Sequence, residues 1–357
     1  MSSIDGDLFN PYTLLPYQNA NNCVRVTDEF MRKLGNDEDW ELKAVTTGAT
    51  LEVIPAKTIM DWIVEATWYS GDPSMQFDTV INDWNTCSNG GRINASNPCS
   101  EYMFIDDSAC NLASLNLRKF LRADGTFDVK KFKNAVDIMI IAQEIIVGNS
   151  SYPTEKITNN SLDYRALGLG YANLGSLLMN LGLPYDSDLG RIIAGLITSI
   201  MTAEAYKMSA KIAAIKRPFA GYESNKEPML KVIEKHNAAA DKLAGYISDH
   251  PNQEKSYRSP LLVSLASEST KTWQEAVTLG REFGYKNAQV TLLAPTGTIA
   301  FLMDCDTTGI EPELALVKYK KLVGGGTLKL VNNQVGPALK RLGYDEKQIA
   351  AILKYVF

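Results

Sequence analysis

Long segments with helical periodicity place the strongest constraint on how this chain can fold. Between positions 128 and 283, apolar residues recur at helical spacing in several segments, which polar or Pro-containing stretches separate. We expect Asp128 to cap a helix whose apolar face runs from Val129 to Val147. The segment 167–183 is apolar around much of its circumference, which predicts a buried helix. Further helices are expected at 187–216, 223–244 and 267–283.

Shorter elements are expected on both sides of this helical region. Alternating and β-branched residues predict short strands around a hairpin at 24–29 and 40–53. The apolar run 288–294, flanked by turn residues, predicts a buried strand. The remaining expectations are an irregular lead-in at 1–22, a helix at 56–70, a polar surface connection between the helices at 223–244 and 267–283, and a final amphipathic helix from Asp345.

The composition is that of a soluble globular protein. The chain has 357 residues, of which 45% are hydrophobic and 22% charged, enough for one large domain or two smaller ones. A formal net charge of -5 gives no electrostatic case for a nucleic-acid partner. No apolar run is long enough to cross a bilayer and no leader opens the chain, so no membrane association and a cytoplasmic location are expected.

The cysteines and histidines suggest neither a disulfide scaffold nor a metal site. There are five cysteines, an odd number, and no pair has CxxC spacing. His236 and His250 have no partners at metal-ligand spacing. We interpret Cys23, Cys87 and Cys305 as structural residues.

The stretch from Asn94 to Leu117 concentrates the reactive side chains. Cys99 and Cys110 are eleven positions apart, and Cys99 has Asn97 and Glu101 two residues to either side. In an extended segment, residues 97, 99 and 101 would project from the same face and bring an amide, a thiol and an acid together. Pro98 favours the tip of a loop for this group. Taken singly, each thiol favours the alternative of a small buried core residue, the usual place of a free cysteine.

A second candidate site follows the predicted strand at 288–294. Pro295, Thr296, Gly297 and Thr298 place a glycine between two hydroxyl residues, which can aim backbone N–H groups and hydroxyls at an anion. The functional interpretation is a phosphate-binding loop. The alternative is a tight turn in which the Thr hydroxyls bond their own backbone, and four residues alone favour that alternative.

Four motifs together carry a resemblance to a known family. NPCSE followed by DDSACNLASLNL, then RALGLGYANLG, and LLAPTGTIAFLMDCDTTGIEPELALVKYKKLVGGG occur in the expected order. The chain resembles, from about Asn19 onward, the catalytic barrel of ribonucleotide reductases, closest to the class II, adenosylcobalamin-dependent branch. The resemblance implies an α/β fold: a single domain over 1–357 that forms part of a ten-stranded α/β barrel, with a central finger loop at about 94–117 and a phosphate-binding loop at about 294–299.

The resemblance also implies roles for individual residues. Cys99 matches the cysteine that becomes a thiyl radical and removes hydrogen from the 3′ carbon of the ribose. Glu101 matches the carboxylate that takes the 3′-OH proton, and Asn97 the amide that binds the substrate's hydroxyls. Cys110 matches one half of the dithiol that supplies the reducing equivalents. Further substrate contacts are implied for Ala95 and Ser96, and phosphate contacts for Pro295, Thr296, Gly297 and Thr298.

The chain also departs from the family pattern. The part upstream of Met1 that would supply the first barrel strands, the partner cysteine of Cys110 and the allosteric loops is missing, as is the C-terminal tail with the shuttle cysteines. We therefore expect a partial barrel that needs a second polypeptide. The implied partners are adenosylcobalamin, a ribonucleoside di- or triphosphate and a reductant of the thioredoxin or glutaredoxin type.

Two alternatives remain open at this point. The chain could be a catalytically silent nucleotide-binding or assembly module that keeps the barrel, or part of a class I large subunit, whose radical comes from a separate metal-bearing subunit. Retention of Asn97, Cys99, Glu101 and Cys110 as a complete set favours an enzyme. The eleven-residue spacing of the two cysteines and the DCDTTGIEP context resemble class II more closely.

Overall fold

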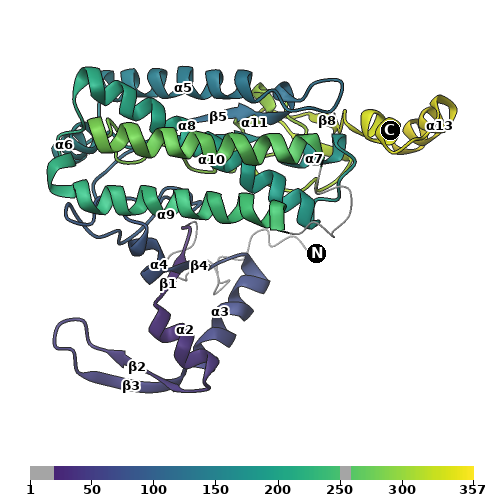
Figure 1. Cartoon of the computed structure of the whole chain (residues 1–357). Helices are drawn as coiled ribbons and strands as arrows, with labels where there is room; N and C mark the ends of the chain where they lie inside the picture. Colours follow the sequence, from purple (N-terminus) through teal and green to yellow (C-terminus); the bar gives the residue numbers. More distant parts are fainter. Residues whose placement is uncertain (1–19, 250–258) are drawn as a thin grey trace. The chain divides into compact units, whose positions relative to one another are not determined.

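The computed structural model describes residues 20–249 and 259–357, which form two compact units (Figure 1). Of the described residues, unit 1 contains those up to Trp84 together with Ser96–Ser100, and unit 2 contains Asn85–Ala95 and those from Glu101 onward. The single domain expected over 1–357 stays a prediction. Most of the expected lead-in, most of the expected polar connection, and His250 lie outside the described residues.

The described part of unit 1 contains two small two-stranded sheets and three helices. In one sheet the strands are parallel and Arg25 lies opposite Gln76; in the other they are antiparallel, which confirms the expected hairpin. The predicted strand at 24–29 is too long, because the Thr27 hydroxyl accepts a hydrogen bond from the Phe30 N–H and starts a helix. The elements are β1 (Cys23–Val26), α2 (Asp28–Gly35), β2 (Asp39–Lys43), β3 (Thr50–Pro55), α3 (Ala56–Ser70), β4 (Ser74–Phe77) and α4 (Asp78–Asp83).

Long helices form the bulk of unit 2. Helix α10 packs against α8 and α9, and α5 packs against α8, so that they lie side by side (Figure 1). Their caps are local: Asp128 and Ser187 each accept a backbone N–H from the first turn, which confirms the predicted cap at Asp128. The helices are α5 (Val129–Asn149), α6 (Glu155–Tyr164), α7 (Leu174–Asn180), α8 (Asp188–Lys216), α9 (Tyr222–Asp249) and α10 (Pro260–Phe283).

The start of α10 differs from the sequence expectation. The helix begins at Pro260 rather than at 267, because the Ser259 hydroxyl accepts from the Leu262 N–H and proline suits the first helical position. Among the helices of the described ranges, none combines the length and the apolar character that a bilayer crossing requires.

The buried helix predicted at 167–183 is wrong in its first half. Residues Leu167–Ala172 form β6, which pairs in parallel with β5 (Asn111–Asn116), and only α7 is helical. Both faces of β6 are covered, so its residues are all buried and the alternation typical of a half-exposed strand is missing. Its two glycines allow close packing, since a Cβ on Gly170 would lie 2.5 Å from the Leu292 carbonyl oxygen.

The segment predicted as a strand at 288–294 does lie along β6. The Leu167 and Leu169 N–H groups donate to the carbonyls of Gln289 and Val290, and a parallel bridge joins Leu169 to Thr291. Regular strand geometry is limited to that bridge. The core of unit 2 forms between this layer and the helices, and its largest fully buried side chains include Trp273, Tyr171, Tyr285 and Phe132.

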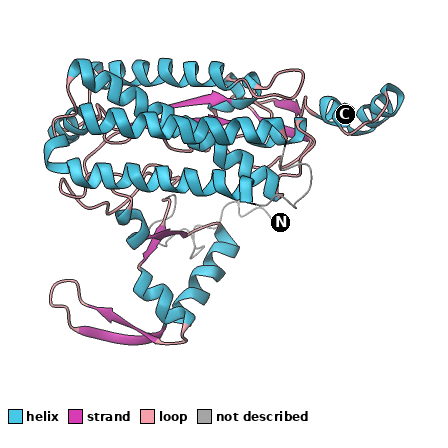
Figure 2. Ribbon diagram, in the orientation of Figure 1, coloured by secondary structure: helices cyan, strands magenta, loops and turns pink. Residues whose placement is uncertain are grey.

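Short elements complete unit 2. A capping box between Asp345 and Gln348 opens the last helix, as expected. The Gly-rich turn Gly324–Gly326 joins two antiparallel strands, and Figure 2 shows how short the strands are beside the helices. These elements are η1 (Leu117–Phe120), α11 (Ile299–Leu302), β7 (Val317–Lys321), β8 (Thr327–Val331), α12 (Val335–Arg341) and α13 (Glu346–Val356).

Candidate active site

Cys99 lies at the corner of a tight turn in unit 1. The Ser100 N–H donates to the Asn97 carbonyl oxygen at 3.0 Å, so Pro98 and Cys99 occupy the two central positions. The Cys99 side chain is exposed and Asn97 is half-buried. The predicted tip is confirmed, but the extended geometry expected for residues 97, 99 and 101 is wrong, because the chain reverses at Cys99 and Ser100 has a φ of 66°.

Polar contacts within unit 1 hold the residues that flank this turn. The Ser96 hydroxyl donates to the Asn97 carbonyl oxygen at 2.8 Å and accepts from the Gln76 amide at 2.7 Å. The two hydrogen bonds of the Ser96 hydroxyl therefore stabilise the turn. Ala95, the other weak candidate for substrate contact, is exposed and belongs to unit 2.

Glu101 and Cys110 are both in unit 2, and Glu101 affects the ionisation of Cys110. The Glu101 Oε2 atom is buried and has no hydrogen-bond partner among the described residues. Burial, and secondarily the charge of Glu101, raise the pKa of the Cys110 thiol to about 12. Cys110 therefore stays protonated at neutral pH. The Oε2 atom of the neighbouring Glu101 is thus a buried acceptor without a donor among the described residues.

The position of the Cys110 sulfur depends on a glycine in the neighbouring strand. Cys110 directly precedes β5, and its Sγ lies 2.6 Å from where a Cβ on Gly168 would be. The side-chain ends of Leu292 and Leu112 lie 2.6 Å and 2.9 Å from the same point. The sulfur therefore occupies the space that any side chain at position 168 would need.

The two hydroxyl residues of the predicted phosphate loop have different surroundings. Thr296 is buried with a φ of 54°, and its hydroxyl accepts from the Gly309 N–H at 2.7 Å. The Thr296 hydroxyl therefore stabilises the fold, as in the tight-turn alternative. The backbone group that it binds, however, belongs to Gly309 and not to its own turn. Gly297 and Thr298 are exposed, and no atom lies within 4 Å of a Cβ placed on Gly297. These two residues remain open to a ligand.

A buried asparagine that the sequence interpretation missed supports this region. Asn173 is fully buried with a φ of 73°, and its side-chain oxygen accepts from the N–H groups of Asp306 and Thr307, both at 3.1 Å. Its amide nitrogen donates to Asn116 Oδ1 at 3.0 Å. The ends of β5 and β6 are thereby tied to the loop that packs on Thr296. The only sequence signal was an Asn in a Gly-rich motif, since Asn tolerates positive φ.

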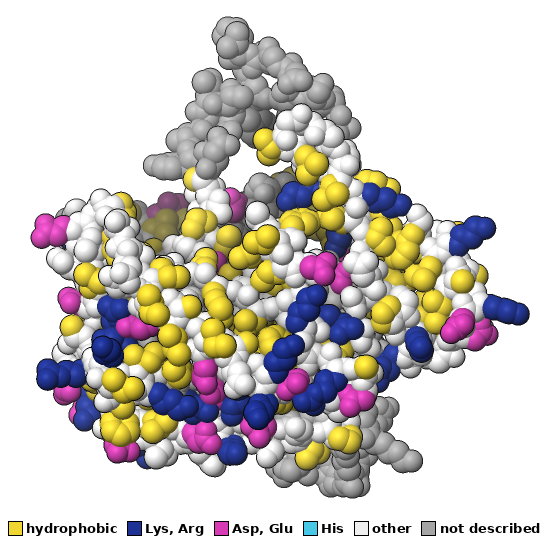
Figure 3. All heavy atoms as spheres, turned by 90° about the horizontal axis from the view of Figure 1, so that it is seen from above, with side chains coloured by type: hydrophobic (Ala, Val, Ile, Leu, Met, Phe, Trp, Pro, Cys, Tyr) yellow, Lys and Arg dark blue, Asp and Glu magenta, His cyan; other side chains and the backbone are white. Residues whose placement is uncertain are grey.

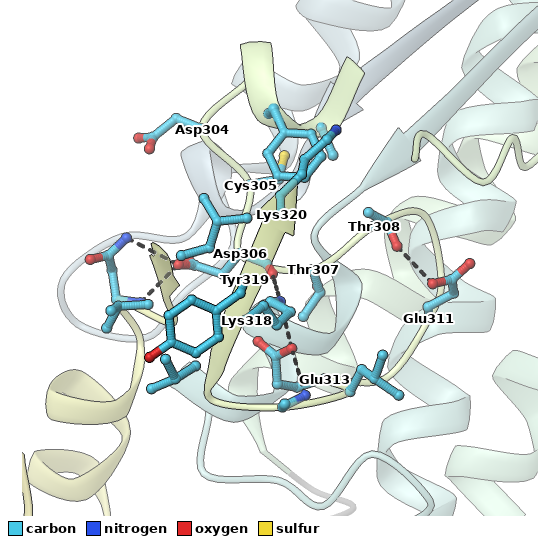
Figure 4. Close-up of a pocket in the computed structure, with 18 of the residues that line it drawn as sticks. Asp304, Cys305, Asp306, Thr307, Thr308, Glu311, Glu313, Lys318, Tyr319 and Lys320 are labelled. Carbon is cyan, nitrogen blue, oxygen red and sulfur yellow. Dashed lines mark hydrogen bonds and ion pairs between the residues drawn. The ribbon is translucent and has the colours of Figure 1, made fainter. Parts of the chain in front are cut away.

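A cavity of about 740 Å³ lies between residues 304–315 and the β7–β8 hairpin (Figure 4). Its charged groups are largely paired within its own wall. Lys318 Nζ donates to Glu313 at 2.6 Å and to the Asp306 carbonyl oxygen at 2.8 Å, and Lys320 lies 3.9 Å above the ring of Phe301. Cys305 also lines the cavity, and burial together with neighbouring aspartates raises its pKa to about 11. None of the predicted site residues lines this cavity.

Comparison with known proteins shows which family the chain is similar to. The sequence profile of the ribonucleotide reductase barrel domain matches residues 15–356. A vitamin B12-dependent ribonucleotide reductase from Rhodopirellula baltica is 48% identical over 347 residues, which cover 97% of this chain and 32% of that protein. One from Streptomyces clavuligerus is 47% identical over 348 residues, covering 96% of this chain and 35% of that protein.

A more distant relative carries a more specific name. A vitamin B12-dependent ribonucleoside-diphosphate reductase from Mycobacterium tuberculosis is 27% identical over 331 residues, covering 93% of this chain and 39% of that protein. The chain thus spans about a third of the length of the curated relatives it matches. The α/β barrel expected from the motifs is confirmed by the profile match. The chain belongs to the ribonucleotide reductase family and carries its barrel domain.

Proposed function

We propose that this chain is the catalytic-barrel portion of an adenosylcobalamin-dependent ribonucleotide reductase, which converts ribonucleotides to deoxyribonucleotides by thiyl-radical chemistry. The observation that carries the proposal is the state of the two cysteines. Cys99 is exposed at the corner of a turn, whereas Cys110 is shielded beside Gly168 and held in its thiol form. The names of the most similar relatives support the same activity.

The environment of each side chain fits the role that the family resemblance implies. The Cys99 thiol would lose its hydrogen atom and then take one from the 3′ carbon of the ribose, an exchange between bonds of similar strength. Glu101 would accept the 3′-OH proton through its unpartnered oxygen, a contribution of roughly 10² to 10⁴ in rate for a well-placed base. Asn97 would hold the substrate's hydroxyls through its amide. Ala95 and Ser96 stay weaker candidates for substrate contact.

Cys110 would deliver reducing equivalents after water leaves the 2′ carbon. Its raised pKa keeps the hydrogen on the sulfur, which suits donation of a hydrogen atom and disfavours reaction as a thiolate with outside oxidants. Pro295, Thr296, Gly297 and Thr298 would bind the substrate's phosphate. Within that loop, Gly297 and Thr298 would make the direct contacts because they are exposed, while Thr296 fixes the loop through Gly309.

Adenosylcobalamin would supply the radical that starts the reaction. The side chain that would face such a partner is Cys99, because its thiol is exposed at the corner of a turn, whereas the other exposed thiol, Cys23, lies outside the proposed site. The relatives' names support this coenzyme over a separate metal-bearing subunit.

The further partners are proposed from the family. The relatives are about three times as long as this chain, so a second polypeptide or further segments would supply the first barrel strands, the partner cysteine of Cys110 and a redox tail. A reductant of the thioredoxin or glutaredoxin type would restore the dithiol. The substrate would be a ribonucleoside diphosphate, as in the name of the mycobacterial relative, or a triphosphate. Supplying DNA precursors in this way would place the protein in the cytoplasm.

The test of this proposal is replacement of the radical-carrying thiol. In protein that contains the remaining barrel segments, with adenosylcobalamin and a dithiol, Cys99→Ala should reduce deoxynucleotide formation to background, since no other exposed thiol would occupy its place. Cys23→Ala is the matched control, because Cys23 is also exposed in unit 1 but lies outside the proposed site. Full activity in Cys99→Ala would overturn the proposal, and no product from the unaltered protein would favour a silent assembly module.

A further inference from the structure

A buried glutamine in unit 1 connects the parallel strand pair to the turn that carries Cys99. Gln76 lies in β4 directly opposite Arg25 in β1, and the residue is 3% exposed. Arg25 is itself fixed, because its Nε and Nη2 donate to Asp78 Oδ1 at 3.1 Å and 2.8 Å. Its Nη1 donates to the Gln76 side-chain oxygen at 3.0 Å.

This arrangement decides which way the Gln76 amide points. A guanidinium can only donate hydrogen bonds, so the amide oxygen must face Arg25 and the amide nitrogen must face away from it. That nitrogen donates to Ser96 Oγ at 2.7 Å and to Ser100 Oγ at 2.9 Å. The side-chain oxygen of Gln76 therefore accepts one hydrogen bond from Arg25, and its side-chain nitrogen donates one to each serine.

The two serines bracket the reactive residue. Ser96 and Ser100 stand immediately before and after the three residues Asn97, Pro98 and Cys99. The turn between them contains one backbone hydrogen bond, from Ser100 to Asn97, and Ser100 has a positive φ of 66°. Because Cys99 is exposed, packing around its side chain cannot hold the corner in place. The Gln76 amide nitrogen binds both ends of the turn, which a hydrogen bond from Ser96 Oγ to Ser100 Oγ at 3.4 Å also joins directly.

We propose that Gln76 is a positioning residue, which fixes the turn so that the Cys99 sulfur is presented in one place. This inference rests on the proposed function of Cys99. Its consequence for catalysis is large, since displacing a reacting atom by about 1 Å can cost on the order of 100-fold in rate. Gln76 does not itself touch the reacting atoms in this proposal; it acts through Ser96 and Ser100.

The experiment compares Gln76→Met with Thr27→Ala in the whole natural protein that carries this chain. Methionine matches the length of glutamine but can neither donate to the two serines nor accept from Arg25, which keeps its two hydrogen bonds to Asp78. Thr27→Ala removes the cap of α2 in the same unit and leaves the contacts of Gln76 with Ser96 and Ser100 in place, so it controls for a general loss of stability. Hydrogen exchange is followed by mass spectrometry over residues 94–102, which include the Ser100 amide, and over β1 and β4.

We expect Gln76→Met to speed exchange in 94–102 at least tenfold while exchange in β1 and β4 stays near the wild-type rate. Thr27→Ala should speed exchange in α2 and leave 94–102 unchanged. Unchanged exchange in 94–102, or an equal rise throughout unit 1, would overturn the positioning role.

Kinetics provide the second readout. For Gln76→Met, kcat should fall roughly 10- to 100-fold while KM for the nucleotide stays within about twofold, because sulfur placement and not substrate affinity is altered. A rise in KM with unchanged kcat would contradict the inference. If the unaltered protein makes no deoxynucleotide at all, the proposed function fails, and the exchange measurement still decides whether Gln76 orders the turn.

Discussion

At the scale of single residues, the reactive positions depend on neighbours that have no reactive chemistry. Cys110 owes its place to the missing side chain of Gly168, and Thr296 owes its buried, left-handed conformation to the Gly309 N–H. Both supporting glycines are needed for space: a Cβ on Gly309 would lie 2.9 Å from the Ala294 carbonyl oxygen. Around the proposed site, the packing therefore restricts how large a side chain can be as well as its chemical type.

Gly168→Ala should show this restriction directly. The added methyl group would meet Cys110 Sγ and Leu292 Cδ2, both at 2.6 Å, so these side chains must move from their places in the core. We expect a loss of about 1–3 kcal/mol in the free energy of unfolding, typical of overpacking, measured by urea titration.

Gly336→Ala is the matched control for that substitution. Gly336 lies in α12, and the nearest atom to an added Cβ is 3.7 Å away, so alanine should be neutral or stabilise by about 0.5–1 kcal/mol. Equal stability of the two variants would show that the space beside Cys110 is not restricted.

At the scale of elements, the helical layer of unit 2 contains a buried charge network. Glu204 in α8 forms ion pairs with Lys207 at 2.6 Å and with Lys133 of α5 at 3.2 Å, and Lys207 also pairs with Glu275 of α10 at 3.1 Å. On the face seen in Figure 3, Lys and Arg side chains lie among Asp and Glu side chains, so charge there is mixed. Helices α5, α8 and α10 are thus joined by charge as well as by apolar packing.

Asp137 makes this layer sensitive to pH. Burial, and then the charge and hydrogen bond of Glu204, raise the pKa of Asp137 to about 6. A carboxyl group with a raised folded-state pKa binds more protons in the native than in the unfolded state between about pH 4 and pH 6. Its contribution to stability is therefore present at about pH 4 and lost as the pH rises through 6.

Asp137→Asn should remove that contribution to the pH dependence. The variant should gain stability relative to wild type as the pH rises from about 4 to about 7, by on the order of 1 kcal/mol after allowance for solvent screening. Asp163→Asn, at an exposed position in α6, should follow the wild-type profile. Parallel profiles for wild type and Asp137→Asn in urea unfolding would contradict the buried coupling to Glu204.

At the scale of the whole molecule, the chain matches one part of its longer relatives. It aligns with about a third of each of the most similar relatives. In the described part, β5 has β6 as its strand partner and β1 has β4, so each sheet has strand edges to which further segments can pair.

We expect the 357-residue chain alone to make no deoxynucleotide. Adding a polypeptide that supplies the upstream barrel segments, with adenosylcobalamin and a dithiol, should produce it, because the partner of Cys110 and the remaining strands would then be present. Omission of the coenzyme is the control and should abolish the product. Turnover by the chain alone, or without the coenzyme, would refute this expectation.

Much of the local structure could be predicted from the sequence. The helix at 56–70, the Asp128 cap and the Asp345 cap depend on residues a few positions apart, and all three are confirmed. Errors arose where distant contacts override local preference. Residues 167–172 are predicted to be helical, but they form a strand between β5 and Gln289–Leu292. Burial on both faces removes the alternation of apolar and polar residues that marks a strand in a sequence.

The amino-acid sequence by itself determined the family, the order of its motifs and the identity of the candidate side chains, because these reside in the order of residues. Tertiary structure alone decided how those side chains are held. Gln76 is 20 and 24 residues from the serines it binds, and Asn173 is 133 residues from Asp306. Hydrogen bonds of this kind form only after the strands and loops have packed and brought the partners close together in space. The periodicity of the sequence carries no information about such distances.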